Sequence, residues 1–473
     1  MKTLPLQRNV GFLKSALTGI GGFHTTEDIV AWLRATPVER PQVVNPIPFD
    51  ALVDWSFRET GGDLVHRSGK FFRVTGLRVR TDLGPRPQWE QPIIDQPEIG
   101  ILGIIAREFD GVLHLLMQAK MEPGNPLGVQ LTPTVQATRS NYTQVHQGTR
   151  PLYLDHFLER GHARVLVDQL QWEHGSAFLR KRNRNMVIEI NEDLPLEPGF
   201  HWLTLGQVKN LMRQPNLVSM DTRTVVACMN LVDARKSDSL DGLDREQAGE
   251  FAGAVLDSFA SQEAASTDEE VMSWLTGLKV GHHLGLEHIG LSGLSGWKRT
   301  DREIRPDGGG FFTVIAVDVK SASREVVRWT QPMIAAGEVG LVGFLTTKID
   351  GVLHALVRAR VEPGSADTIT LGPTVQSALG GEGSGGDGGH SEYFELVKNA
   401  ADATVRYSCL QSEEGGRFYH VVSDYRIVDV DGAHQLELPP ECLWLSFRQM
   451  QEMVRYGLLG VEARSLLSCL SFA

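Results

Sequence analysis

The chain repeats itself once, and this duplication constrains its fold more than any other feature of the sequence. The string Asp-Gly-Val-Leu-His occurs at residues 110–114 and again at 350–354, and Glu-Pro-Gly occurs at 122–124 and 362–364. Each pair is separated by 240 positions. A solenoid repeat is only about 20–50 residues long, so this spacing indicates two copies of a whole domain.

Further matches keep the same spacing to within two positions. They are Gln91-Pro92 with Gln331-Pro332, Glu98 with Glu338, 133–136 with 373–376, Trp32 with Trp274, Trp202 with Trp444, Arg223 with Arg464 and Cys228 with Cys469. We therefore divide the chain into a first repeat (1–235), a linker (236–261) and a second repeat (262–473). The linker is polar and rich in Ala, Gly and Asp, with a helical turn expected around 245–259.

The hydrophobic pattern predicts the same order of elements in both repeats. Helices are expected at 25–33, after the capping-box sequence at 266–269, and at 218–229 and 459–470; strands are expected at 71–79 and 311–319. Asp110-Gly111 is a strong signal for a two-residue hairpin turn. We predict an α/β fold in which each repeat is a mixed sheet flanked by helices.

Charge and composition exclude several classes of protein. The 46 Lys and Arg residues against 58 Asp and Glu residues give a net charge of −12, which disfavours binding to nucleic acid or to an anionic membrane. We find no secretory leader and no apolar run near the ~20 residues of a membrane helix. The four cysteines form no Cys-x-x-Cys motif, so a cytoplasmic protein with reduced thiols is expected.

Two predicted strands each carry one polar face. Side chains alternate across a strand, so Gln118, Lys120 and Glu122 share one face of the first, and Gln136 and Thr138 share one face of the second. A solvated surface is one interpretation. Amides, hydroxyls, one Lys and one Glu, without the long mixed charges of an open surface, favour a lined cleft.

A dense string of hydrogen-bonding side chains follows the second of these strands: Arg139, Ser140, Asn141, Tyr142 and His146. It is either a capped turn or a substrate-binding loop. The equivalent stretch of the second repeat, 377–389, is mostly glycine. A purely structural cap should persist in both copies. Because the second repeat has lost these polar residues, a role in substrate binding or catalysis in the first repeat is favoured.

A local concentration of cations occupies residues 180–184. Arg182 and Arg184 share one strand parity with Arg180, whereas Lys181 and Asn183 share the other. Since Arg offers a fork of donors that matches phosphate oxygens, Arg182 and Arg184 are candidates for binding a pyrophosphate. A solvated edge strand is the alternative.

Several cofactor and metal motifs are missing from the sequence. There is no Gly-x-Gly-x-x-Gly between a strand and a helix, no Walker loop, no Gly-x-Ser-x-Gly and no His-Glu-x-x-His. His282, His283 and His288 lack acidic partners at ligand spacing. We therefore predict neither a metal site nor a cofactor.

The strings at 91–98, 118–125 and 133–142 resemble the NDP-hexose 2,3-dehydratase family, and the resemblance covers nearly the whole chain. It implies a doubled Nudix-like α/β/α sandwich, assembled as a homodimer. It also implies deoxysugar biosynthesis for glycosylated natural products, antibiotics among them. The Nudix metal box (Gly-x5-Glu-x7-Arg-Glu-x2-Glu-Glu-x-Gly) is missing here, which argues against diphosphate hydrolysis and a magnesium cluster.

The implied substrate is dTDP-4-keto-6-deoxy-D-glucose. A base removes the C3 proton, which the C4 ketone acidifies, and an acid assists departure of the C2 hydroxyl. The enol then becomes dTDP-3,4-diketo-2,6-dideoxy-D-glucose, an unstable product for a downstream NADPH-dependent 3-ketoreductase. No net redox change occurs. The alternatives are a Nudix-type sugar-nucleotide hydrolase and a non-catalytic nucleotide-sugar binding protein.

The candidates for proton transfer are Lys120, Glu122 and Tyr142. Lys120 and Glu122 lie on one strand face, about 7 Å apart by strand rise. Lys120 is replaced in the second repeat by Arg360, which cannot exchange protons near neutral pH. A salt bridge to Lys120 is the alternative role of Glu122.

The remaining candidates concern substrate binding. Trp55 and Trp297 precede the first strand of each repeat and are either thymine-stacking or core residues. Thr374 and Gln376 keep a polar strand face in the second repeat, where we expect a degenerate pocket.

Overall fold

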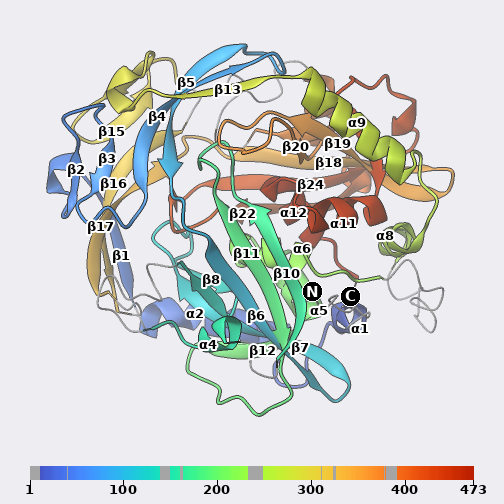
Figure 1. Ribbon diagram of the computed structural model, residues 1–473. Helices are drawn as coiled ribbons and strands as arrows, with labels where there is room; N and C mark the ends of the chain where they lie inside the picture. Colours follow the sequence, from blue (N-terminus) through green and yellow to red (C-terminus); the bar gives the residue numbers. More distant parts are fainter. Residues whose placement is uncertain are drawn as a thin grey trace.

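The structure is a computed structural model, shown in Figure 1. It describes residues 11–39, 41–138, 150–159, 163–232, 249–309, 312–322, 326–377, 379 and 391–472. It is a mixed α/β structure whose two halves repeat the same elements, as the sequence predicts.

A large mixed sheet forms the body of each repeat. In the first repeat the strand order is β10-β11-β6-β7-β12, with β8 beside β7 and β9 beside β6; in the second it is β20-β19-β18-β24-β22, with β25 beside β19 and β21 beside β18. The first-repeat strands are β6 (Gly100–Phe109), β7 (Val112–Met121), β8 (Val129–Thr132), β9 (Val135–Ala137), β10 (Arg164–Trp172), β11 (Arg182–Glu189) and β12 (Phe200–Thr204). Their counterparts are β18 (Gly340–Ile349), β19 (Val352–Arg360), β20 (Thr370–Gly372), β21 (Val375–Gln376), β22 (Val405–Ser412), β24 (Val422–Asp429) and β25 (Cys442–Ser446).

The hairpin predicted at Asp110-Gly111 is confirmed. Asp110 and Gly111 have φ angles of 50° and 74°, and Asp350 and Gly351 have 48° and 84°. Positive φ at both central residues is the geometry of a type I′ turn, which matches the twist of the two strands that it joins.

A smaller sheet accompanies each large one, and the two small sheets exchange strands. One contains β2 (Trp55–Phe57), β3 (Leu64–His66), β4 (Arg73–Thr81), β5 (Gln88–Asp95) and β13 (Leu284–His288). The other contains β14 (Trp297–Arg299), β15 (Glu303–Pro306), β16 (Thr313–Ser321), β17 (Arg328–Ala335), β23 (Phe418–Tyr419) and β1 (Gln42–Ile47).

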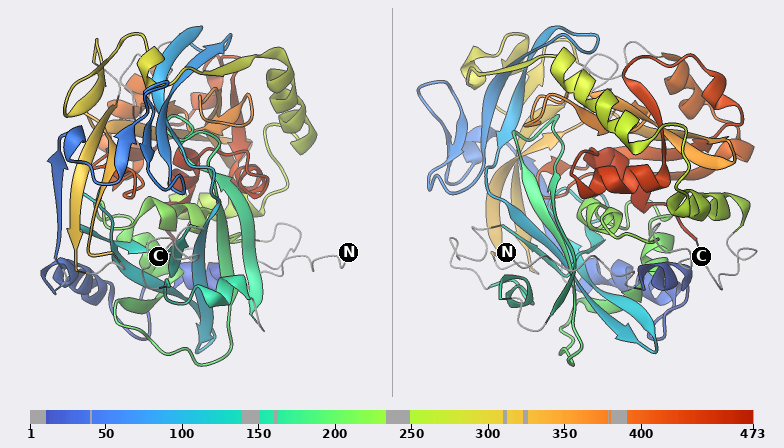
Figure 2. Two further views of the ribbon diagram at one scale, coloured as in Figure 1. Left: turned by 60° about the vertical axis from the view of Figure 1, so that its left-hand side comes forward. Right: turned by 45° about the vertical axis from the view of Figure 1, so that its right-hand side comes forward.

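The exchange is reciprocal. β1 of the first repeat pairs antiparallel with β16 of the second, and β13 of the second pairs antiparallel with β4 of the first. Dark blue β1 accordingly lies beside the gold strands, and yellow β13 beside the blue ones (Figures 1 and 2). Each repeat therefore completes the sheet of the other.

The helices occupy equivalent places in the two repeats. They are α1 (Phe12–Leu17), α2 (Thr26–Glu39), α4 (Asp155–Leu158), α5 (Leu205–Leu211), α6 (Met220–Ala227), α8 (Glu250–Ala260), α9 (Asp268–Gly281), α10 (Ser391–Lys398), α11 (Phe447–Arg455) and α12 (Val461–Ser468). Thr267 caps α9 in a capping box with Glu270. The predicted helices and strands are present, with ends shifted by a few residues.

Helix α8 lies inside the segment that we expected to be a linker, but it packs as part of the second repeat. The Ser258 hydroxyl donates to the carbonyl of Leu353 at 2.6 Å and accepts from the amide of Phe447 at 2.9 Å. In α1, Ser15 bonds Leu113 and Leu205 in the same way. Hence α8 is the counterpart of α1. The boundaries at 235 and 262 stay predictions.

The centre of the molecule is the contact between α6 and α12, which lie side by side in Figure 1. Their arginines, Arg223 and Arg464, are fully buried. Arg223 donates to the carbonyl of Ser412 at 2.7 Å, and Arg464 donates to the carbonyl of Trp172 at 2.6 Å. Each arginine thus holds the end of an edge strand of the opposite repeat, which fixes where the following loop begins.

Candidate active site

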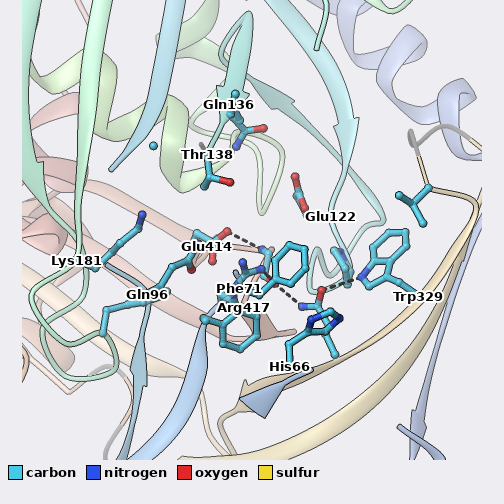
Figure 3. Close-up of a pocket in the computed structure, with 18 of the residues that line it drawn as sticks. His66, Phe71, Gln96, Glu122, Gln136, Thr138, Lys181, Trp329, Glu414 and Arg417 are labelled. Atoms are coloured by element: carbon cyan, nitrogen blue, oxygen red, sulfur yellow. Dashed lines mark hydrogen bonds between the residues drawn. The ribbon is translucent and has the colours of Figure 1, made fainter. Parts of the chain in front are cut away.

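One cavity of about 690 Å³ lies against the large sheet of the first repeat. Its walls come from the ends of β6, β7, β9 and β11, from α6 and from the small sheet of the first repeat. The second repeat supplies part of β17 and the loop that contains Glu414, Gly416 and Arg417. The site is therefore composite, although it is centred on the first repeat (Figure 3).

A chain of polar contacts runs along the sheet side of the cavity. The Lys120 ammonium lies 2.9 Å from Glu122 Oε1 and donates to Gln136 Oε1 at 2.8 Å. The Gln136 amide in turn donates to the Asp221 carboxyl group on α6. Both the predicted proximity of Lys120 and Glu122 and the salt bridge that we considered for Glu122 are therefore present.

Two further glutamates, Glu173 and Glu414, line the cavity and interact electrostatically. Glu173 Oε1 accepts from Asn183 Nδ2 at 2.7 Å, and Glu414 Oε1 accepts from the Gly416 amide at 2.8 Å. The second oxygens, Glu173 Oε2 and Glu414 Oε2, are buried without a hydrogen-bond partner among the described residues. Buried polar atoms of this kind call for a functional explanation.

The electrostatics of the cavity favour protonated carboxyl groups. Burial raises the pKa of Asp221 well above its usual range, and the charges of Glu414 and Glu173 raise it further. Burial also raises the pKa of Glu414; Arg417 opposes this shift, and Glu122 and Glu173 reinforce it. The cavity thus combines the salt bridge between Lys120 and Glu122 with carboxyl groups whose pKa is raised, an arrangement that suits acid–base catalysis.

Lys181 provides a second ammonium group. It lies across the cavity from Glu122 in Figure 3 and donates to the Glu98 carbonyl. Burial lowers its pKa.

Glycines allow the loop that carries Glu414 to approach the first repeat. The amide of Gly124 donates to the carbonyl of Gly415 at 2.8 Å, and the amide of His420 donates to the carbonyl of Gly124 at 3.0 Å. A Cβ at Gly124 would lie 1.6 Å from the Phe418 carbonyl oxygen. Close contact between two backbones therefore explains the glycine of the repeated Glu-Pro-Gly motif.

The equivalent position in the second repeat is filled by protein side chains. His174 of the first repeat lies there, with Nδ1 2.9 Å from Glu462 and Nε2 3.3 Å from Glu413. Glu362, the counterpart of Glu122, accepts from the Gly175 amide at 3.1 Å and from Gln376 at 3.3 Å. All of these side chains are buried.

The structure brings part of the predicted site together. The predicted residues that line the cavity are Trp55, Lys120, Glu122, Gln136 and Thr138. The predicted residues that lie elsewhere are Gln118, Arg182, Arg184, Trp297, Thr374 and Gln376. The candidates Arg139, Ser140, Asn141, Tyr142 and His146 are outside the described residues.

Arg182 and Arg184 of β11, which we expected to bind the pyrophosphate, do not line the cavity. The Arg184 guanidinium makes two hydrogen bonds of 2.6 Å to the carboxylate of Asp168, and Arg182 lies 4.9 Å from the centre of the Trp172 ring. Lys181 and Asn183, which have the opposite strand parity, line the cavity. Strand periodicity separates the two sets, but it does not tell which face meets the cavity.

The tryptophans that we expected near the thymine also join the two small sheets. Trp55 donates from Nε1 to the Thr330 carbonyl at 3.0 Å, and Trp297 donates to the Glu90 carbonyl at 2.7 Å. Trp55 is 8% exposed and lines the cavity, whereas Trp297 does not.

Polar strand residues beyond Gln136 and Thr138 have structural partners. The second predicted strand, residues 129–138, is two strands in the structure, because β8 pairs with β7 and, after Pro133, β9 pairs with β6. Gln130 bonds the Ser412 hydroxyl at 2.5 Å. Thr134 bonds the Leu116 carbonyl at 2.5 Å, and Thr374 bonds the Leu356 carbonyl likewise. These residues stabilise the backbone rather than line the cavity.

Sequence reasoning missed Glu173, Asp221 and Glu414 as site residues. A signal was present for each. Acidic residues occupy 173 and 413 in the two repeats, and Asp221 and Glu462 each precede the matched arginines by two positions. Position 174 is His where 414 is Glu, a difference between copies that marks a functional asymmetry.

In the part of the chain that the structure describes, no group of three or more His, Cys, Asp or Glu side chains is arranged to hold a metal ion. Among the same residues, no helix combines the length and the apolar character needed to span a membrane.

Comparison with known proteins bears on the site as a whole. The family described as NDP-hexose 2,3-dehydratase matches residues 26–229 and again residues 268–470. Three proteins named dTDP-4-dehydro-6-deoxy-alpha-D-glucopyranose 2,3-dehydratase are similar over nearly their whole length. The protein from Saccharopolyspora spinosa is 45% identical over 460 residues (97% of this chain, 94% of the relative).

The protein from Amycolatopsis orientalis is 42% identical over 465 residues (97% and 93%), and that from Streptomyces violaceoruber is 41% identical over 457 residues (96% and 97%). Both the doubled family match and the coverage agree with the duplication read from the sequence. The chain belongs to the NDP-hexose 2,3-dehydratase family.

Proposed function

We propose that this chain removes the C2 hydroxyl of dTDP-4-keto-6-deoxy-D-glucose to give dTDP-3,4-diketo-2,6-dideoxy-D-glucose. The observation that carries the proposal is the cavity, in which Lys120 and Glu122 lie beside carboxyl groups whose pKa is raised. Relatives with the 2,3-dehydratase name support the same reaction. A volume of about 690 Å³ is large enough for a ligand of this size.

The first step that we propose is removal of the C3 proton by Glu122. The electron pair moves through C3 and C4 onto the C4 oxygen, which becomes an enolate. The Lys120 ammonium lies 2.9 Å from Glu122 and is held by Gln136, so it is positioned to stabilise that oxygen. Groups that stabilise a developing oxyanion contribute up to a few kcal/mol of barrier reduction.

The second step expels the C2 oxygen as water. The C4 carbonyl re-forms, a C2–C3 double bond appears and the C2–O bond breaks while an acid supplies a proton. The resulting 3-hydroxy enone tautomerises to the diketone. Tyr142, Asn141 and Arg139 stay sequence-based candidates for contacts to the sugar, as do Ser140 and His146.

For the nucleotide we propose the end of the cavity lined by the small sheets. His66 is the last residue of β3, Arg67 and Ser68 follow it, and Phe71 and Trp329 offer aromatic faces. Trp55 is a further candidate for the thymine. Aromatic faces suit a base, and Arg67 suits a phosphate.

Several finer proposals rest on the family resemblance. We propose a Nudix-like ancestor for each repeat, assembly as a homodimer, and a role in making a glycosylated natural product such as an antibiotic. A downstream NADPH-dependent 3-ketoreductase would consume the unstable product. A cytoplasmic location is supported by the four cysteines, all described, which are buried and form no disulfide.

The decisive experiment is incubation with dTDP-4-keto-6-deoxy-D-glucose, with a 3-ketoreductase and NADPH present to trap the product. Mass spectrometry should detect a 2-deoxygenated dTDP-sugar. Release of dTMP or dTDP without deoxygenation would instead identify a hydrolase. Saturable binding without turnover would identify a binding protein.

A further inference from the structure

The carboxyl group of Glu414 is unusual because it belongs to one repeat and serves the cavity of the other. It reaches the cavity at the tip of the β22–β24 connection, where Gly415 docks on Gly124. A Cβ at Gly415 would lie 2.0 Å from Asn125 Oδ1, so the loop approaches the first repeat this closely only because residue 415 is glycine. Figure 3 shows Glu414 pointing into the space between Lys181 and Glu122.

One oxygen of Glu414 is committed and the other is not. Oε1 accepts from the Gly416 amide at 2.8 Å, whereas the buried Oε2 has no hydrogen-bond partner among the described residues. An unpartnered oxygen on a cavity wall is available to a ligand. A protonated carboxyl in this position can donate a hydrogen bond to it.

We infer that Glu414 is the general acid that protonates the departing C2 hydroxyl. This inference rests on the proposed function and adds the identity of the acid. The active site is then incomplete without the second repeat, because the acid comes from there.

The step balances as follows. After the C3 proton has left, the enolate electron pair re-forms the C4 carbonyl and the C2–C3 double bond forms. The C2–O bond breaks, and its electrons leave with the oxygen, which takes the Glu414 proton and departs as water. Glu414 is left ionised and regains a proton from solvent or from the group that accepted the C3 proton.

The surrounding charges suit this role. Glu122, Glu173 and Asp221 face Glu414 from the end of β7, the β10–β11 connection and α6, with Lys181 and Arg417 as the nearby cations. Burial raises the pKa of Glu414, the charge of Arg417 opposes this shift, and the carboxylates of Glu122 and Glu173 reinforce it, so the net effect favours the protonated form. Asp221 is the competing acid, but its carboxyl group already accepts the Gln136 amide.

The test is Glu414→Gln, which keeps the size and removes the proton. In deuterated water, exchange of the C3 hydrogen should stay within about threefold of wild type. Formation of 2-deoxygenated product should fall by about 10²–10⁴-fold, the usual contribution of a positioned acid. Glu392→Gln, an exposed site in the same repeat, is the matched control and should change neither rate.

A substrate analogue with fluorine in place of the C2 hydroxyl separates acid catalysis from a structural role. Fluoride leaves with little help from an acid, so Glu414→Gln should lose far less activity on this analogue. Equal losses on both substrates would overturn the inference, as would wild-type turnover of Glu414→Gln. If Glu414→Gln does not fold, Glu414→Asp is measured with the same two substrates and the same criteria.

The proposed function and the assignment of Glu414 as the acid can be contradicted independently of each other. If the wild-type chain forms no 2-deoxygenated product from the hydroxyl substrate, there is no elimination and both proposals are wrong. If wild type eliminates water and only the Glu414 variants contradict expectation, the fault lies with the acid alone. Loss of elimination in Asp221→Asn with normal Glu414→Gln would transfer the role to Asp221.

Discussion

His174 and Glu414 hold the same place in their two repeats, and each side chain lies in the site of the opposite repeat. Glu414 enters an open cavity beside Glu122, whereas His174 lies buried between Glu413 and Glu462. The backbone of the two loops is alike, since Gly175 and Gly415 make equivalent contacts with Gly364 and Gly124. The difference between His174 and Glu414 therefore distinguishes a cavity that can accept a ligand from a site filled by protein side chains.

The buried His174 should contribute strongly to stability. We expect His174→Gln to lower the free energy of unfolding by about 3–5 kcal/mol, because it leaves Glu413 and Glu462 buried without their cation. Urea denaturation measures this, with the exposed His288→Gln as control. An effect no larger than that of the control would contradict the ion-pair interpretation.

The contacts of His174 with Glu413 and Glu462 also predict that the free energy of unfolding depends on pH. Burial alone would lower the pKa of His174, but Glu462 and Glu413 outweigh it and raise the pKa well above its usual value. The stabilisation is therefore complete below the unfolded-state pKa of about 6.5 and is lost as the pH rises through the higher folded-state value. The difference between wild type and His174→Gln should shrink from pH 7 to alkaline pH. Burial also lowers the pKa of Lys209 to about 8, but that effect is common to both proteins and cancels.

The Lys120 ammonium and the Glu122 carboxylate should be needed for the same early step. We expect Lys120→Met and Glu122→Gln each to reduce kcat by about 10²–10⁴-fold, together with the exchange of the C3 hydrogen in deuterated water. NMR follows exchange and turnover in one sample. Lys298→Met, on the exposed strand β14, serves as the control. Normal exchange in both site variants would remove this pair from the mechanism.

The contact between the two repeats at Gly124 is open to a direct test. A Cβ there would lie 1.6 Å from the Phe418 carbonyl, so Gly124→Ala should cost about 1–3 kcal/mol or more and displace the loop that carries Glu414. Turnover should fall with stability. Gly277→Ala is the matched control, because nothing lies within 4 Å of its new Cβ and alanine favours the exposed helix by about 1 kcal/mol.

The cations of β11 should differ in their effect on substrate binding. Arg184→Ala breaks only a partly exposed pair with Asp168, so KM should be unchanged and the loss of stability should stay below about 1 kcal/mol. Lys181→Met removes an ammonium that lines the cavity and should raise KM. Steady-state kinetics measure KM for both variants. A raised KM for Arg184→Ala alone would support the original prediction that Arg184 binds the pyrophosphate.

The sequence by itself determined the duplication, the order of the elements and the hairpin turns, because these follow from local periodicity and from turn residues such as Asp110-Gly111. It also identified Lys120 and Glu122 as neighbours, because strand alternation places residues two apart on one face.

Only the tertiary structure decided which faces meet the cavity and which repeat supplies each group. Alternation separates Arg184 from Lys181, but the packing of the small sheets and α6 decides which of them faces inward. The exchange of β1 and β13 and the docking of Gly415 on Gly124 join residues more than 200 positions apart. Such contacts have no local pattern, since they depend on backbone shape and buried area between distant segments. For that reason the difference between His174 and Glu414 can be read from the sequence, but only the folded chain shows that Glu414 lies near Glu122.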